Sequence, residues 1–126
     1  MEEFEITRQH DETSMTEVAG QNCERFIAVC NNDEIYYIFY LKLSNVYHRF
    51  FLDAGNLFWR SGENPDEEDD LDGGDRYVDL GREYDLVGSS VSSIIFQNDR
   101  LEMKFSNDVS LLFEEGINDV GARMIR

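Results

Sequence analysis

Alternation of apolar and polar residues, the pattern typical of β-strands, is clearest in the C-terminal third of the chain. Within Leu101–Phe105 the apolar residues alternate with Glu102 and Lys104, so that one face is apolar and the other is charged. Similar runs occupy Val91–Phe96 and Val109–Glu114, and an Asn-Asp pair separates each run from the next. The pattern predicts three antiparallel strands joined by two short turns.

A second series of alternating runs lies between residues 25 and 60. Arg25–Cys30 is strand-like and ends in three turn residues, and Glu34–Leu43 is apolar on both faces over most of its length. A strand of the latter kind is typically central and covered on both sides. Val46–Asp53 places His48 on its more apolar face, and a short turn leads to Leu57–Arg60. We expect these segments to form three or four consecutive antiparallel strands joined by short turns.

Shorter patterns complete the expected fold. Phe4–Arg8 alternates and predicts a strand, and Tyr77–Leu80 and Tyr84–Val87 are short extended segments. Ser14–Glu17 has the spacing of a capping box, which predicts one short N-terminal helix. A helical turn is expected in the tail, Gly116–Arg126.

These elements predict a single domain, residues 1–126, of the mostly-β to α+β class. Its core is expected to be one antiparallel sheet of about seven or eight strands, strongly curved or shaped as a half-barrel.

Charge is distributed unevenly along this chain. Its 126 residues include 27 acidic and 11 basic ones, giving a formal charge of −16. Residues 1–24 hold seven acidic residues and one basic residue, and residues 63–75 hold eight acidic residues and no basic one. The remaining ten basic and twelve acidic residues nearly balance. The strand-forming region is therefore almost neutral, and two segments carry most of the charge.

The second of these segments, residues 61–75, is named the acidic loop. It contains the only proline of the chain and two adjacent glycines, which predicts a long loop inside the domain. One interpretation is a solvated hairpin tip. The other is a recognition surface for a basic protein, because clustered carboxylates accelerate association with a cationic partner.

Tryptophan, tyrosine and arginine, the residue types enriched in binding hot spots, flank the acidic loop. Ordinary packing at a strand end is the alternative interpretation for these aromatic residues. The predicted partner-binding residues are Trp59, Arg60, Glu63, Asp66, Glu67, Glu68, Asp69, Asp70, Asp72, Asp75 and Tyr77.

Several functional classes are disfavoured by composition. The negative charge opposes direct binding to nucleic acid and to anionic membranes. The N-terminus has no signal-peptide pattern, and the longest apolar run, Ile35–Leu41, is far shorter than the roughly 20 residues of a membrane span. Cys23 and Cys30 are predicted to lie on opposite faces of one strand, which favours two free thiols. A reduced, cytoplasmic protein is expected.

No catalytic residue, cofactor or metal site is expected. Glu102 and Lys104, with Asp85 upstream, have the spacing of a metal-dependent nuclease, but alternating charges on the wet face of a strand explain them equally. His48 is interpreted as a histidine at the edge of the core, hydrogen-bonded to the backbone.

The acidic loop also contains a partial calcium motif. Glu68, Asp70, Asp72 and Gly73 imitate the start of an EF-hand loop, whereas Asp79 at its twelfth position departs from the pattern. A calcium-binding module is therefore retained as an alternative.

The small acidic domain and its closing meander, Val91–Phe96 followed by Leu101–Phe113, resemble a small bacterial immunity protein of the kind paired with polymorphic or contact-dependent toxins. The resemblance implies a non-catalytic inhibitor that binds a basic toxin domain, often a nuclease, and blocks its active site. No residue role is transferred from it. A further alternative is a nucleic-acid mimic that inhibits restriction or repair enzymes.

Overall fold

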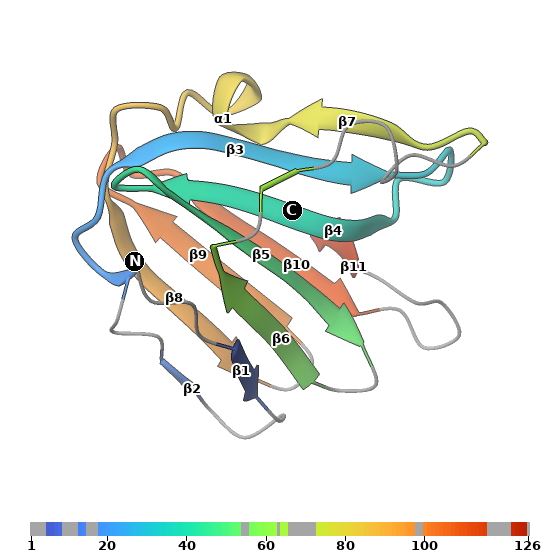
Figure 1. Ribbon diagram of the computed structural model, residues 1–126, viewed down its shortest axis with the longest axis horizontal. Helices are drawn as coiled ribbons and strands as arrows, with labels where there is room; N and C mark the ends of the chain where they lie inside the picture. Colours follow the sequence, from blue (N-terminus) through green and yellow to red (C-terminus); the bar gives the residue numbers. More distant parts are fainter. Residues whose placement is uncertain are drawn as a thin grey trace.

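A computed structural model describes residues 5–8, 13–14, 18–53, 56–62, 64–65, 73–97, 100–115 and 122–125. The described chain is mostly β, with one antiparallel sheet nearly closed as a barrel (Figure 1). Its elements are β1 (Glu5–Arg8), β2 (Thr13–Ser14), β3 (Cys23–Cys30), β4 (Tyr36–Leu43), β5 (Val46–Asp53), β6 (Asn56–Ser61), β7 (Arg76–Asp79), α1 (Leu80–Glu83), β8 (Val91–Gln97), β9 (Arg100–Phe105), β10 (Ser110–Glu115) and β11 (Ala122–Ile125).

Strand β4 is the centre of the topology. One of its edges pairs with β3, which in turn pairs with β7, and the other pairs with β5, followed by β6 and β1. At the beginning of β4, Tyr36 also pairs with Ala122 of β11, from which the sheet continues through β10, β9 and β8 to β2. Figure 1 shows β8, β9 and β10 facing the β4–β6 side of the molecule.

Backbone hydrogen bonds between the start of β3 and the segment before β8 bring the sheet back on itself. The Cys23 N–H donates to the Ser89 carbonyl at 2.7 Å, and the Gly88 N–H donates to the Cys23 carbonyl at 2.9 Å. Further along, the Val91 N–H donates to the Gln21 carbonyl at 2.9 Å. Gly88 has a φ of +93°, a left-handed conformation that glycine adopts most readily. This turn therefore helps to close the barrel.

Aromatic side chains from successive strands fill the interior. Phe39, Phe50 and Trp59 are cross-strand neighbours on β4, β5 and β6, and their rings stack at centroid distances of 4.8 and 4.4 Å. Phe113 of β10 contacts Phe39 edge-on from the opposite wall at 4.8 Å. Such ring pairs add to the burial of apolar area that stabilises the fold.

The structure confirms the predicted mostly-β antiparallel architecture and the meander formed by β8, β9 and β10. It also confirms β1 near the N-terminus and the two free, buried thiols, Cys23 and Cys30. No helix among the described residues is long and apolar enough to cross a membrane.

The predicted N-terminal helix falls largely outside the described residues, and Val18 at its end lies in a 3₁₀-helical turn. The α-helix in the described part of the chain is α1, where the Asp79 carboxylate accepts the Arg82 N–H at 3.0 Å and caps the first turn. Ser14, the expected helix cap, belongs to β2, and residues 15–17 lie outside the described residues.

Two local predictions were wrong. Tyr84–Val87 forms turns after α1, whereas an extended segment was predicted. A helical turn was also expected in the tail. Ala122–Ile125 is instead a strand, which pairs with β10 and β4.

Candidate functional site

Basic and aromatic side chains share the outer face of β3–β6. Cross-strand pairing aligns Arg25 with Lys42, Lys42 with Tyr47, Arg49 with Arg60, and Phe51 with Phe58, so all seven residues lie on the side facing away from the core. We name this group the outer face. Its members are Arg25, Lys42, Tyr47, Arg49, Phe51, Phe58 and Arg60.

Ring and cation contacts fix part of this outer face. Phe51 and Phe58 stack at 5.0 Å, and the Arg49 guanidinium carbon lies 5.5 Å from the centre of the Phe51 ring. The Lys42 Nζ lies at the same distance from the Tyr47 ring. Aromatic rings attract cations through their quadrupole, so these contacts hold the long side chains against the sheet.

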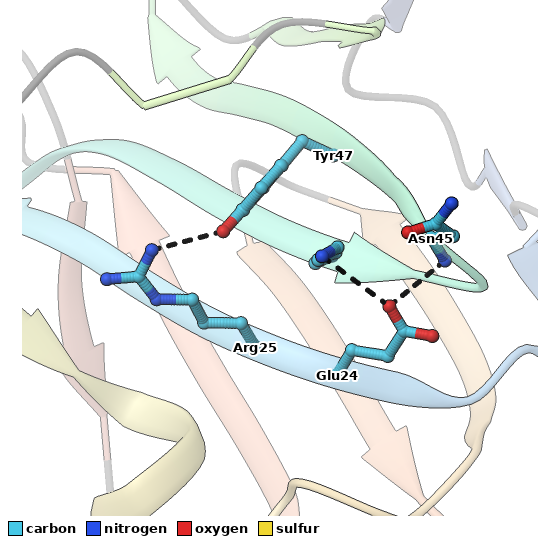
Figure 2. A network of polar contacts seen from close by, with 5 residues as sticks. Glu24, Arg25, Asn45 and Tyr47 are labelled. Carbon is cyan, nitrogen blue, oxygen red and sulfur yellow. Dashed lines mark hydrogen bonds and ion pairs between the residues drawn. The ribbon is translucent and has the colours of Figure 1, made fainter.

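A polar network at the β4–β5 turn completes this arrangement (Figure 2). The Glu24 carboxylate accepts the Asn45 N–H at 3.1 Å and lies 3.9 Å from the Lys42 Nζ. Beside it, the Arg25 guanidinium donates to the Tyr47 hydroxyl at 3.1 Å. Tyr47 is therefore positioned both by Arg25 and by the ring contact with Lys42.

The acidic loop begins next to the outer face. Its Gly62 N–H donates to the Tyr47 carbonyl at 2.8 Å. Gly62 and Asn64 also line a cleft of about 380 Å³ together with Lys42 and Tyr47. The N-terminal end of the acidic loop is thus adjacent to Tyr47 of β5.

The C-terminal end of the acidic loop contacts the turn between β3 and β4. A Cβ atom added at Gly74 would lie 2.9 Å from the Asn32 amide nitrogen, and the Arg76 guanidinium donates to the Asn31 carbonyl at 2.9 Å. Asp33 and Glu34 in this turn are exposed.

Asp75 is close enough to this turn to act, together with Glu34, on the Cys30 thiol. Burial raises the pKa of the Cys30 thiol, and the negative charges of Glu34 and Asp75 raise it further, against the opposite effect of Arg76. We name Asp33, Glu34 and Asp75 the acidic end. In the sequence Asp33 was visible only as a turn residue, and Glu34 was expected to begin a strand that in the structure starts at Tyr36. The pairing of β3 with β7, which brings both residues to the acidic loop, joins distant segments that local pattern does not connect.

The structure corrects the prediction for Trp59. Its side chain is only 1% exposed, and its indole N–H donates to the His48 Nδ1 at 3.0 Å. Because successive residues of a strand point to opposite faces, Phe58 and Arg60 lie on the outer face while Trp59 lies in the core. The packing interpretation therefore applies to Trp59, and it is not a surface anchor.

The other predicted partner-binding residues fall into three groups. Arg60 and Tyr77 are half-buried, and the pairing of Tyr77 with Val29 of β3 places it on the outer side of the sheet. Asp75 belongs to the acidic end. The remaining predicted residues lie outside the described residues: Glu63, Asp66, Glu67, Glu68, Asp69, Asp70 and Asp72.

His48 is a core-edge histidine, as expected, and is 4% exposed. Burial lowers its pKa to about 4, so it is neutral near pH 7 and accepts the Trp59 N–H. This hydrogen bond is to an indole side chain, whereas a backbone partner was expected.

The nuclease-like residues form a surface ion pair. The Lys104 Nζ lies 3.9 Å from Glu102 on β9, and Asp85 lies in the turn after α1, where its backbone carbonyl accepts from the Asn107 amide at 2.8 Å. Within the described ranges, no three histidine, cysteine, aspartate or glutamate side chains are grouped to hold a metal ion. The calcium-motif residues Glu68, Asp70 and Asp72 lie outside these ranges.

Comparisons with protein-family models, with curated proteins and with solved structures find no match to this chain. The placement of its residues is the basis for the functional interpretation that follows.

Proposed function

We propose that the protein is a non-catalytic, protein-binding inhibitor of the immunity type, which neutralises a basic toxin or nuclease domain by covering its cationic active-site surface. The observation that carries this proposal is the position of the acidic loop. The loop starts at a sheet face that bears Tyr47, Phe51, Phe58 and arginines, the residue types that anchor protein interfaces.

Charge and aromatic area have separate roles in this mechanism. A nuclease active site is built to receive phosphates and is therefore cationic, so carboxylates of the acidic loop can occupy it in place of the nucleic acid. Charge steering mainly raises the association rate, whereas desolvated anchors lower the dissociation rate. The stacked pair Phe51 and Phe58 supplies such an anchor on the sheet face at which the acidic loop begins.

The acidic end extends the same surface. Asp33 and Glu34 are exposed next to Gly74, and Asp75 belongs to the loop itself. These carboxylates sit on ordered backbone, because the Asn31 side-chain oxygen accepts the N–H groups of Asp33 and Ile35 at 2.8 and 3.0 Å. A fixed carboxylate loses less conformational entropy on binding than a mobile one.

Capture from the native source with two charge-matched variants tests the role of the acidic loop. Each variant reduces the net charge of −16 by five, through Asp→Asn and Glu→Gln substitutions. The loop variant changes Asp66, Glu67, Glu68, Asp69 and Asp70. The control variant changes Asp85, Asp99, Glu102, Asp108 and Glu114.

At about 20 mM salt, we expect the parent and the control variant to retain the same basic protein, and the loop variant to bind it at least about tenfold more weakly. Affinity of the parent should fall steeply towards about 0.5 M salt, as measured by biolayer interferometry with the captured protein. Equal binding by the loop and control variants would show that the loop is not the recognition element.

The anchoring role has its own measurement. Replacing Phe51 and Phe58 together by serine removes the stacked pair from the outer face without changing any charge. We expect faster dissociation with a nearly unchanged association rate. A change confined to the association rate would contradict the assignment of this face as the anchor.

A further inference from the structure

A cleft of about 370 Å³ lies beside the acidic end, between α1, β4 and β11. Its lining comes from three segments that are far apart in the sequence: Glu34, Tyr36, Glu83, Tyr84, Arg123 and Met124. Glu34 belongs both to this lining and to the acidic end, so the cleft is continuous with the surface assigned above to partner binding.

Several contacts hold the walls of the cleft. The Tyr36 ring stacks on Phe39 at 5.6 Å and meets Phe113 edge-on at 5.7 Å, so the core fixes its orientation. On the other side, the Tyr84 hydroxyl donates to the Met124 sulfur at 3.0 Å. A cleft with walls fixed in this way is formed before a ligand arrives, which reduces the entropy lost on binding.

The chemistry of this lining suits a cation. Glu34 and Glu83 contribute two carboxylates against the single guanidinium of Arg123, so the lining is net negative. Tyrosine rings attract cations through their faces, and a thioether is polarisable and adapts to an alkyl stem. Burial, together with nearby groups including Glu83 and Glu34, raises the pKa of Tyr36 to about 12, so its hydroxyl remains neutral near pH 7.

The Arg123 guanidinium is directed in part to the neighbouring turn. It donates to the Asp33 carbonyl at 3.4 Å. An arginine is thus already accommodated at this edge of the cleft, against a backbone oxygen and among carboxylates.

We propose that the cleft receives a lysine or arginine side chain of the basic partner, with Glu34 and Glu83 pairing with its charge and Tyr36 and Tyr84 contacting its stem. The inference rests on the proposed function and makes it more specific. The acidic loop attracts the partner, and the cleft recognises one of its cationic side chains.

Nuclear magnetic resonance titration of the full chain tests the site without the partner. The probes are methylguanidinium, methylammonium and the neutral N-methylurea, which has the shape of the first. We expect both cations to shift the amide resonances of Glu34, Tyr36, Tyr84 and Met124 in a saturable way, with N-methylurea at least about tenfold weaker. Equal binding of N-methylurea, or shifts spread evenly over all acidic residues, would overturn the proposal.

Matched variants locate the effect and separate the two proposals. The cleft variant combines Glu34→Gln with Glu83→Gln, and the control combines Glu102→Gln with Asp108→Asn, so each removes two carboxylates that are at least partly exposed. We expect the cleft variant alone to lose at least about fivefold in cation affinity and in affinity for the captured partner. A cleft variant that binds the partner as tightly as its control would refute the inference and leave the proposed function intact.

Failure of the proposed function gives a different result from failure of the cleft assignment. If the acidic-loop variant retains full partner affinity, the proposed recognition of the partner by the acidic loop is wrong, whatever the small cations do at the cleft.

Discussion

At the scale of single residues, the pair of His48 and Trp59 couples the core to protonation. Both side chains are almost fully buried, and the indole N–H donates to the His48 Nδ1 at 3.0 Å. Protonating this nitrogen would remove the acceptor and place a charge among aromatic rings. Burial therefore lowers the pKa of His48 to about 4, whereas an unfolded histidine has a pKa of about 6.5.

This difference predicts a pH-dependent stability. The contribution of neutral His48 to the free energy of unfolding is fully present above about pH 6.5. It is lost as pH falls towards 4, because the unfolded chain then binds a proton that the folded chain excludes. From about pH 7 to pH 5, the free energy of unfolding should fall by about 2 kcal/mol on account of His48. Urea denaturation at several pH values measures it.

His48→Asn is the matched variant for this measurement, since an amide oxygen can accept the indole N–H and does not titrate. The variant should be less stable near pH 7, and its deficit relative to the parent should shrink by about 2 kcal/mol at about pH 5. A deficit that stays constant with pH would rule out a titrating His48.

At the scale of elements, closure of the barrel depends on the turn before β8, residues 86–90, which lies outside the named strands. The Gly88 and Ser89 backbone groups pair with Cys23, and Val91 pairs with Gln21, which joins the start of β3 to β8. The Ser89 hydroxyl donates to the Leu86 carbonyl, and the Ser90 N–H donates to the Ser106 hydroxyl at 2.8 Å, so the turn is also fixed from within and from the β9–β10 turn.

Gly88→Ala tests this turn. Nothing lies within 4 Å of an added Cβ, so the cost comes from the φ of +93° alone, and we expect about 1–2 kcal/mol of destabilisation. Gly73→Ala is the control, because that position has equal space and no positive φ. Urea midpoints of the two variants give the comparison, and equal midpoints would contradict a conformational role for Gly88.

Prediction from the sequence succeeded where one face alternates clearly with the other. β9 is an example, because Leu101, Met103 and Phe105 all enter the core. β11 was missed, since Ala122–Ile125 is short and is a strand only through its pairing with β10 and β4. Local pattern cannot specify such long-range pairing.

The candidate site was likewise predictable in part, from local pattern but not from long-range pairing. The acidic loop and its flanking residues were visible as charge and composition, whereas the outward face of Phe58 and Arg60, and with it the inward face of Trp59, followed only from the register of β6 against β5. A shift of one residue in a strand exchanges its two faces. The cleft between Glu34 and Glu83 likewise depends on three segments meeting in space.

At the scale of the whole molecule, a nearly neutral barrel carries strongly acidic segments. The formal charge of −16 arises mainly from residues 1–24 and 63–75. Like charges at this density repel one another and oppose the compact state, and dissolved salt screens that repulsion.

Thermal stability should therefore rise with salt. Between about 0.01 and 0.3 M salt we expect the Tm to increase by roughly 3–6 °C, as for about 1 kcal/mol of relieved repulsion. The variant with five neutralised carboxylates in the acidic loop should show a smaller increase in Tm over the same range of salt. Thermal scans by circular dichroism measure both, and an unchanged Tm in the parent would contradict the expected repulsion.

Trp59 is the only tryptophan of the chain, and its stacked, hydrogen-bonded position gives it a further role as an optical probe. Its fluorescence and near-ultraviolet dichroism report on the barrel interior and not on the acidic loop, the outer face or the cleft. Opening of the core must change these signals, whereas docking of a partner on the surface leaves the indole environment as it is. A single spectrum can thus distinguish a variant that has lost its fold from one that has lost only its partner.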